Sequence, residues 1–165
     1  MAGPRLDIRP AGATDHDPVW RIFHEVVAAG DTYAWPPETT RDEALALWFP
    51  AHGHAFVAEI GDDVVATYLL KPNQPGQGRH VANCAYMVAA RAAGQGVGEA
   101  LCRHSMEEAK RLGFEAMQFN FVVSTNERAM RLWTKCGFTI VGTLPRVFRH
   151  PVQGLVDAYV MHRFL

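Results

Sequence analysis

The spacing of apolar residues divides the chain into strand-like and helix-like segments. Apolar and polar residues alternate over residues 6–10, which predicts a first strand. Apolar residues then recur at helical spacing as far as Gly30 and predict the buried face of a first helix. Residues 14–18 favour the start of this helix, with an Asp or Thr cap and proline in the first turn. A short second helix is predicted over residues 40–49, where Pro50 ends it.

The same periodicities predict the rest of the fold. The further elements, in chain order, are strands at 54–60, 64–70 and 81–88, a helix at 97–112, a strand at 116–123, a helix that begins near 124–127 and ends at Gly137, and strands at 138–148 and 155–164. The start at 124–127 has the spacing of a capping box. The order βααβββαβαββ predicts an α+β sheet with helices on both faces, in one domain over residues 1–165.

Composition narrows the class of protein. The chain has 165 residues, of which 48% are apolar and 20% charged, as is ordinary for a globular domain. No apolar run approaches membrane-helix length, and the first ten residues lack the apolar segment of a signal peptide. A net charge of -1 argues against nucleic acid as a partner. Three cysteines and eight histidines without metal-ligand spacing predict reduced thiols in a cytoplasm and no metal.

A glycine-rich segment between strand 81–88 and helix 97–112 carries the first chemical signal. Gly94, Gly96 and Gly98 alternate with larger residues where the helix begins. Backbone N–H groups without partners at a helix start favour binding of an anion, and a diphosphate is the expected ligand. A P-loop would need Lys after the last glycine, but Glu99 stands there. The dinucleotide fingerprint also fits poorly, because the turn lies mid-chain without the required later acidic residue.

A second motif follows in the next predicted helix. Residues 126–138, Asn-Glu-Arg-Ala-Met-Arg-Leu-Trp-Thr-Lys-Cys-Gly-Phe, match the pattern Asn-x-x-Ala-x-x-Leu-Tyr/Trp-x-x-x-Gly-Phe. With the glycine motif before it, at the usual separation, the chain resembles the GNAT superfamily of acetyl-CoA-dependent N-acetyltransferases. The resemblance covers roughly residues 83–141 and implies a mixed, mostly antiparallel sheet that is splayed at the cofactor site.

The resemblance implies a binding path for acetyl-CoA. The pantetheine arm would lie beside the strand that precedes the glycines, and the pyrophosphate would lie on the amides of the turn. The expected cofactor-binding residues are Met87, Val88, Ala93, Gly94, Gln95, Gly96, Val97, Gly98, Asn126, Ala129, Trp133 and Lys135. Asn126 could instead be a plain helix cap. Lys135, together with Arg131, would bind the adenosine phosphates; the alternative is that both lie on a solvated helix face.

Two residues depart from the family pattern. The leading Arg of the glycine motif falls on Ala93, whereas Arg91 stands two residues earlier. We therefore expect the backbone to bind the phosphates; Arg91 either reaches round to them or is an ordinary loop arginine. Trp133 replaces a tyrosine that can protonate the leaving thiolate, and its indole N–H can only donate a hydrogen bond. Packing is an equal alternative for Trp133.

Two asparagines in otherwise apolar strands are the candidates for catalysis. Asn83 and Asn120 would need partners if buried, so they are either core amides or groups that hold substrate, water or the oxyanion. Their context is similar to that of proline-analogue (azetidine-2-carboxylate) N-acetyltransferases, which implies the amine of an amino acid or analogue as substrate. Tyr33 and Trp35, from a loop that also holds Asp31, are candidates to line the amine pocket; the equal alternative is that they only pack within the loop.

Rival functions are a protein or peptide N-acetyltransferase, for which we see no acidic run to form a groove, and a non-catalytic sensor that binds CoA. Cys84 is disfavoured as an acyl-enzyme nucleophile, because the family transfers acetyl directly. The family resemblance also suggests a homodimer formed through the late strands.

Overall fold

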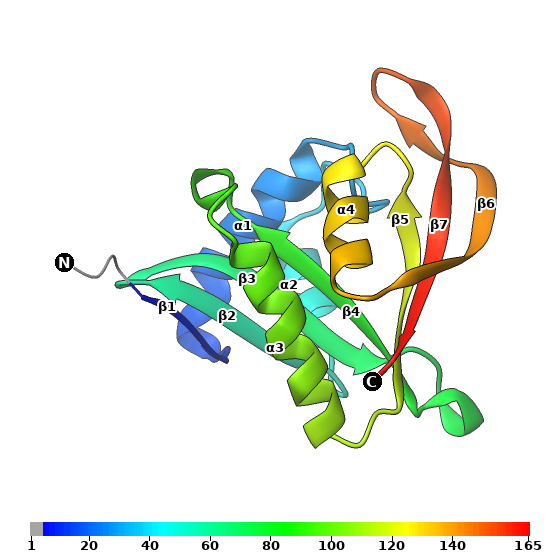
Figure 1. Ribbon diagram of the computed structural model, residues 1–165. Coiled ribbons are helices and arrows are strands. Elements are labelled where there is room, and N and C mark those ends of the chain that lie inside the picture. The colour runs from blue at the N-terminus through cyan, green and yellow to red at the C-terminus, as the bar shows by residue number, and fades with distance from the viewer. Residues whose placement is uncertain (1–4) are drawn as a thin grey trace.

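In the computed structural model, which describes residues 5–165, seven strands form one sheet in the order β1-β2-β3-β4-β5-β7-β6 (Figure 1). The strands are β1 (Leu6–Pro10), β2 (His54–Ile60), β3 (Asp63–Pro72), β4 (Val81–Val88), β5 (Ala116–Val123), β6 (Thr139–His150) and β7 (Gly154–Phe164). Neighbouring strands are antiparallel except β4 and β5, which run parallel. The predicted α+β class and the mixed, mostly antiparallel sheet are therefore confirmed.

Four helices cover the two faces of the sheet, as predicted (Figure 1). They are α1 (His16–Ala28), α2 (Arg41–Trp48), α3 (Val97–Arg111) and α4 (Glu127–Lys135). One apolar core joins α1 and α2 to one face, and a second joins α3 to the other. Within residues 5–165, no helix combines the length and apolarity that a membrane span requires.

The loop between α1 and α2 is held by aromatic packing. Trp35 packs against Phe23 of α1 and Trp48 of α2, with ring centroids 5.3 and 6.3 Å apart. Tyr33 stacks on Trp35, with centroids 5.0 Å apart and planes 9° from parallel. Trp48 is itself fixed, because its indole N–H donates to the buried Thr67 hydroxyl at 2.8 Å. The loop is therefore held in a fixed position above the sheet.

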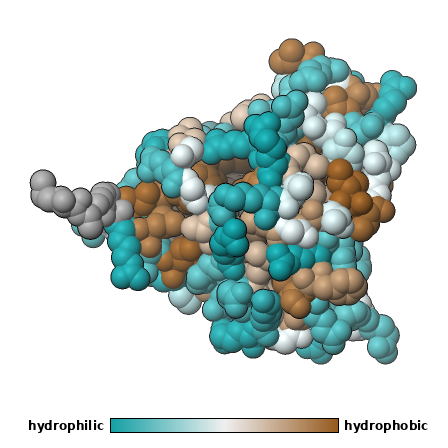
Figure 2. Space-filling view, in the orientation of Figure 1, coloured by the Kyte–Doolittle hydropathy of each residue, from teal (hydrophilic) through white to brown (hydrophobic). Residues whose placement is uncertain are grey.

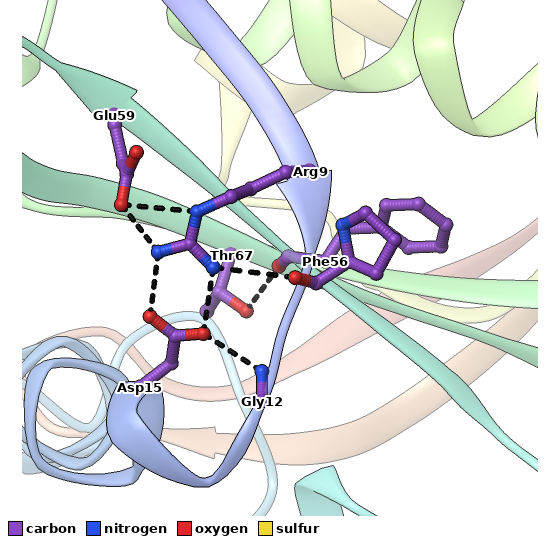
Figure 3. A network of polar contacts seen from close by, with 7 residues as sticks. Arg9, Gly12, Asp15, Phe56, Glu59 and Thr67 are labelled. Atoms are coloured by element: carbon purple, nitrogen blue, oxygen red, sulfur yellow. Dashed lines mark hydrogen bonds and ion pairs between the residues drawn. The ribbon is translucent and has the colours of Figure 1, made fainter.

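The start of α1 lies where it was predicted, with Asp15 as the N-cap residue and Pro18 in the first turn, but the capping differs. A 3-10 turn (Ala13–Asp15) precedes the helix, and the Asp15 side chain does not cap it. The Asp15 carboxylate instead accepts two hydrogen bonds from Arg9, both 2.8 Å, and one from the Gly12 N–H (Figure 3). Arg9 also pairs with Glu59 of β2. Asp15 thus joins the first helix to two strands, and spacing along the chain carried no signal for this contact.

We expect Asp15→Asn to lower the free energy of unfolding by about 2 kcal/mol, because charge-assisted hydrogen bonds to a nearly buried carboxylate are lost. Urea unfolding followed by circular dichroism measures this change. Asp17→Asn is the matched control, since the Asp17 carboxylate pairs with Arg41 at the surface. The control should leave the unfolding midpoint nearly unchanged. Equal losses in the two variants would contradict the role of Asp15.

The same variant has a defined pH dependence. The Arg9 guanidinium lowers the pKa of Asp15 below its ordinary value of 3.8. A carboxylate with a lowered folded pKa stabilises the fold above its unfolded pKa, and this stability is lost as pH falls through the folded value. The stability difference between wild type and Asp15→Asn should therefore be full above about pH 5 and shrink below about pH 4.

Candidate active site

A cleft opens where β4 and β5 part. The two strands pair only at Val81–Ala116 and Ala82–Met117, at the start of each strand. Beyond these pairs lies a cleft of about 1000 Å³, lined by β4, β5, the first turn of α3, helix α4 and the loop that carries Tyr33. Figure 2 shows the molecule hollowed between the start of α3 and α4. We call β4 residues 83–88, on the side that faces this opening, the parted edge.

Most of the residues proposed from the sequence line this one cleft. They are Tyr33, Trp35, Asn83, Met87, Val88, Ala93, Gly96, Val97, Gly98, Asn120, Asn126, Ala129, Trp133 and Lys135. Gly94 and Gln95 do not line it, and both lie exposed at the tip of the turn. The Gln95 side chain instead donates to the Arg91 carbonyl at 3.1 Å.

The main-chain groups of the parted edge follow from the pairing of β4 with β3. The Ala89 N–H donates to Val65, so alternate residues of β4, Met87 among them, direct their peptide groups toward β3. The peptide groups of Val88 and Tyr86 therefore face the cleft. Those of Tyr86 are already bound, because its N–H donates to the Tyr33 hydroxyl at 3.1 Å and its C=O accepts from that hydroxyl at 2.7 Å. Val88, rather than Met87, offers main-chain groups to a ligand.

The glycine turn, residues 94–98, fits an anion. Gly94 and Gly96 both have φ of +78°, a left-handed conformation that side chains rarely adopt. Within residues 5–165, no oxygen accepts a hydrogen bond from the backbone N–H groups of residues 94–99. A Cβ on Gly98 would lie only 3.1 Å from Leu132, so glycine there lets α3 approach α4. The unpaired amides at the start of α3 fit the pyrophosphate of the expected cofactor.

The cations near the turn are held by carboxylates. Arg91 makes two 2.9 Å contacts with Asp63 and a third, of 2.8 Å, with the Val64 carbonyl. Its guanidinium therefore anchors the segment before α3 to β3, and the pKa of Asp63 is lowered by this contact. Lys135 of α4 lies 2.5 Å from Glu99 of α3, which joins the two helices at the rim of the cleft. Arg91 is thus engaged by Asp63 and Val64, and the expectation that the backbone binds the phosphates stays a prediction.

The two candidate asparagines lie in different surroundings. Asn83 is half-buried and donates to the Gln118 carbonyl at 3.0 Å, just beyond the last paired residues of β4 and β5. Asn120 is exposed although the rest of β5 is largely buried, so the alternative of a core amide is wrong for Asn120. Its amide accepts from Gln118 at 2.9 Å and donates to Asn73 at 2.6 Å. The exposure arises because β5 leaves β4 and its pairing with β7 shifts register between Phe119 and Val122.

Helix α4 and its N-cap bring four of the proposed residues to the cleft: Asn126, Ala129, Trp133 and Lys135. The predicted capping box is not formed: Asn126 is the N-cap, and its side chain accepts from the Ala129 N–H at 3.2 Å. The Asn126 side-chain NH₂ remains available as a donor. The Trp133 ring lies 4.9 Å from the rings of both Tyr86 and Phe119. Trp133 thus packs on both parting strands and also lines the cleft.

Several cleft residues carried no usable sequence signal. Glu25 of α1 accepts from the Ala90 N–H at 3.1 Å, and Arg128 lines the cleft from α4. Tyr86 could have been found, because it lies two residues from Val88 on the same edge.

Cys84 is buried, and desolvation raises its pKa to about 12, so it is a neutral thiol. Residues 5–165 contain no cluster of three or more side chains suited to a metal ion.

Comparisons with known proteins agree with this geometry. The model of the acetyltransferase (GNAT) family matches residues 20–138. The N-acetyltransferase aca1 of Schizosaccharomyces pombe is 33% identical in a 153-residue alignment that covers 81% of this chain and 72% of that protein. The structure of a GCN5-related N-acetyltransferase from Kribbella flavida superposes with a TM-score of 0.93 at 44% identity, covering 97% of this chain and 98% of that chain.

A further solved structure, of the Salmonella typhimurium acetyltransferase yncA, contains its cofactor acetyl-CoA. It superposes with a TM-score of 0.82 over 98% of this chain and 94% of that chain, and at 23% identity the likeness concerns the fold alone. Acetyltransferases of this family use acetyl-CoA as acyl donor. From the matched family model and the curated relative, the chain belongs to the acetyltransferase (GNAT) family and is an N-acetyltransferase.

Proposed function

We propose that this protein transfers an acetyl group directly from acetyl-CoA to the amine of a small molecule, an amino acid or an amino-acid analogue. One observation carries the proposal: the cleft between β4 and β5 has unpaired amides at one end and uncharged side-chain amides at its base. The first group suits the diphosphate of the cofactor. The second suits a small polar amine, whose own groups the asparagines would bond.

The residues of the cleft have distinct proposed roles. Acetyl-CoA supplies an acetyl thioester, which a neutral amine attacks with loss of CoA. The amides of residues 94–99 would hold the pyrophosphate, and the peptide groups of Val88 would pair with the pantetheine arm. Asn126, which caps α4, would use its remaining NH₂ hydrogens on the same arm. Lys135, from the rim, would stabilise the phosphates by charge.

The reacting end of the cleft is proposed to use neutral donors. Asn83 and Asn120 would orient the amine, or a water that removes its proton, and Trp133 would direct its indole N–H toward the departing sulfur. The neutral Cys84 thiol is unsuited to a covalent role. Tyr33 and Trp35 would form the wall on the amine side. This arrangement supports the likeness to the proline-analogue acetyltransferases as the narrower form of the proposal.

Exposed apolar side chains on the last two strands and in the turn between them support the expected homodimer, which stays a prediction. A cytoplasmic location also stays a prediction. Ile140, Val141, Val147, Val152, Leu155 and Phe164 are all exposed, and Figure 2 shows hydrophobic residues at the far end of the β6–β7 hairpin.

The direct test combines the protein, acetyl-CoA and a panel of amines, and follows release of the CoA thiol. The panel holds amino acids, cyclic secondary-amine analogues, polyamines and a peptide with a free N-terminus. We expect turnover with amino acids or their analogues. Asn120→Ala should lower kcat/KM for the amine by about tenfold or more, because an orienting group is lost. The affinity for CoA should stay unchanged.

Gln153→Ala is the control for that variant, because it removes an exposed amide that does not line the cleft. Turnover restricted to the peptide would instead favour a peptide N-acetyltransferase. Tight CoA binding without turnover of any amine would favour a sensor. Either result would defeat the small-molecule proposal.

The glycine turn gives a second prediction. Gly96→Ala should weaken CoA binding about tenfold, equal to about 1.4 kcal/mol, because a Cβ at φ +78° strains the turn and moves its amides. Gly113→Ala is the matched control: φ is +88°, at the other end of α3, and neither new Cβ would meet an atom within 4 Å. Isothermal titration with CoA and the thermal midpoint measure both effects. If Gly96→Ala and Gly113→Ala had similar thermal midpoints and bound CoA with equal affinity, the phosphate site would be refuted.

A further inference from the structure

Tyr33 lines the cleft, and its hydroxyl occupies one hydrogen-bonding position of the parted edge. A hydroxyl can donate and accept at once, and the Tyr33 hydroxyl does both with the peptide groups of Tyr86. These are the groups that an extended chain beside β4 would otherwise bond. Burial raises the pKa of Tyr33 well above its ordinary value of 10.0, so the phenol stays protonated and keeps this contact.

The position of this contact along β4 is what gives it a function. Peptide groups on one edge of a strand recur every second residue, about 6.6 Å apart. Val88 lies nearer the glycine turn, and Tyr86 is the next residue toward the base of the cleft. A cofactor with its pyrophosphate on the glycine turn and its arm paired at Val88 must direct its acyl end toward Tyr86. The Tyr33 phenol occupies this position beside Tyr86, and Trp35 stacks on the Tyr33 ring.

We propose that Tyr33 determines the length of the acyl group that this enzyme accepts, by closing the parted edge at Tyr86 so that acetyl fits and longer chains meet the phenol ring. The inference rests on the proposed function, because it requires an acyl-CoA bound along β4. Trp133 supports it from α4, because its ring packs 4.9 Å from the Tyr86 ring and lines the cleft at this level of β4. Tyr33 is thus a specificity-determining residue of the acyl side as well as a wall of the amine pocket.

Two variants separate the ring from the hydroxyl. Tyr33→Ala removes the ring, so the ratio of butyryl-CoA to acetyl-CoA in kcat/KM should rise about tenfold or more. Tyr33→Phe keeps the ring and should keep most of the preference for acetyl. It should, however, speed hydrogen exchange of the Tyr86 amide, measured by NMR, because the hydroxyl that accepts from it is gone. Tyr68→Phe is the matched control, since its hydroxyl contacts His104 outside the cleft.

Binding gives a readout that does not depend on turnover. By calorimetry, the wild type should bind butyryl-CoA more weakly than acetyl-CoA, and Tyr33→Ala should bind both alike, with the affinity for free CoA unchanged. An acyl-CoA ranking that is the same in wild type, Tyr33→Ala and Tyr68→Phe would overturn the inference while leaving the acetyltransferase intact. A wild type that binds no CoA would overturn the proposed function together with the inference.

Discussion

The parting of β4 from β5 after two residue pairs is the constraint on which the site depends. Strands that separate leave peptide N–H and C=O groups without their usual partners, and such groups must be satisfied if they are buried. The protein meets this requirement with side chains: the Asn83 amide binds the Gln118 carbonyl at the point of parting, and the Tyr33 hydroxyl binds Tyr86 farther up. The groups of Val88 remain directed into the cleft.

A second set of free peptide groups lies at the start of α3. Left-handed glycines turn the chain so that the first N–H groups of the helix face outward, and the Arg91–Asp63 contact holds the preceding segment against β3. The apolar face of α3, which includes the fully buried Leu101 and Ala109, fixes the helix on the sheet. The anion-binding end and the parted edge are therefore held at a set separation, which suits one elongated ligand with a charged end and a reactive end.

Local patterns were sufficient to predict the elements and the glycine turn. Strand alternation and helical spacing are short-range properties, so the order of strands and helices follows from them. Contacts between distant residues had no such signal: Tyr33 and Tyr86 are 53 positions apart, and Arg91 and Asp63 are 28 apart. The exposure of Asn120 depends on how β5 shifts between two neighbours, which its own apolar surroundings conceal. Asp15 looked like a cap because its partner Arg9, six residues earlier, is positioned by Glu59 of β2, and local sequence gives no sign of that contact.

The central claim is that free peptide groups at the start of α3 and along the parted edge hold the acyl carrier. Amide hydrogen exchange, measured residue by residue with and without saturating CoA, tests it most directly. The account predicts new protection at residues 94–99 and at Val88, with no change at Gly113 beyond the other end of α3. Protection confined to other parts of the sheet, or none at all under saturating CoA, would contradict it.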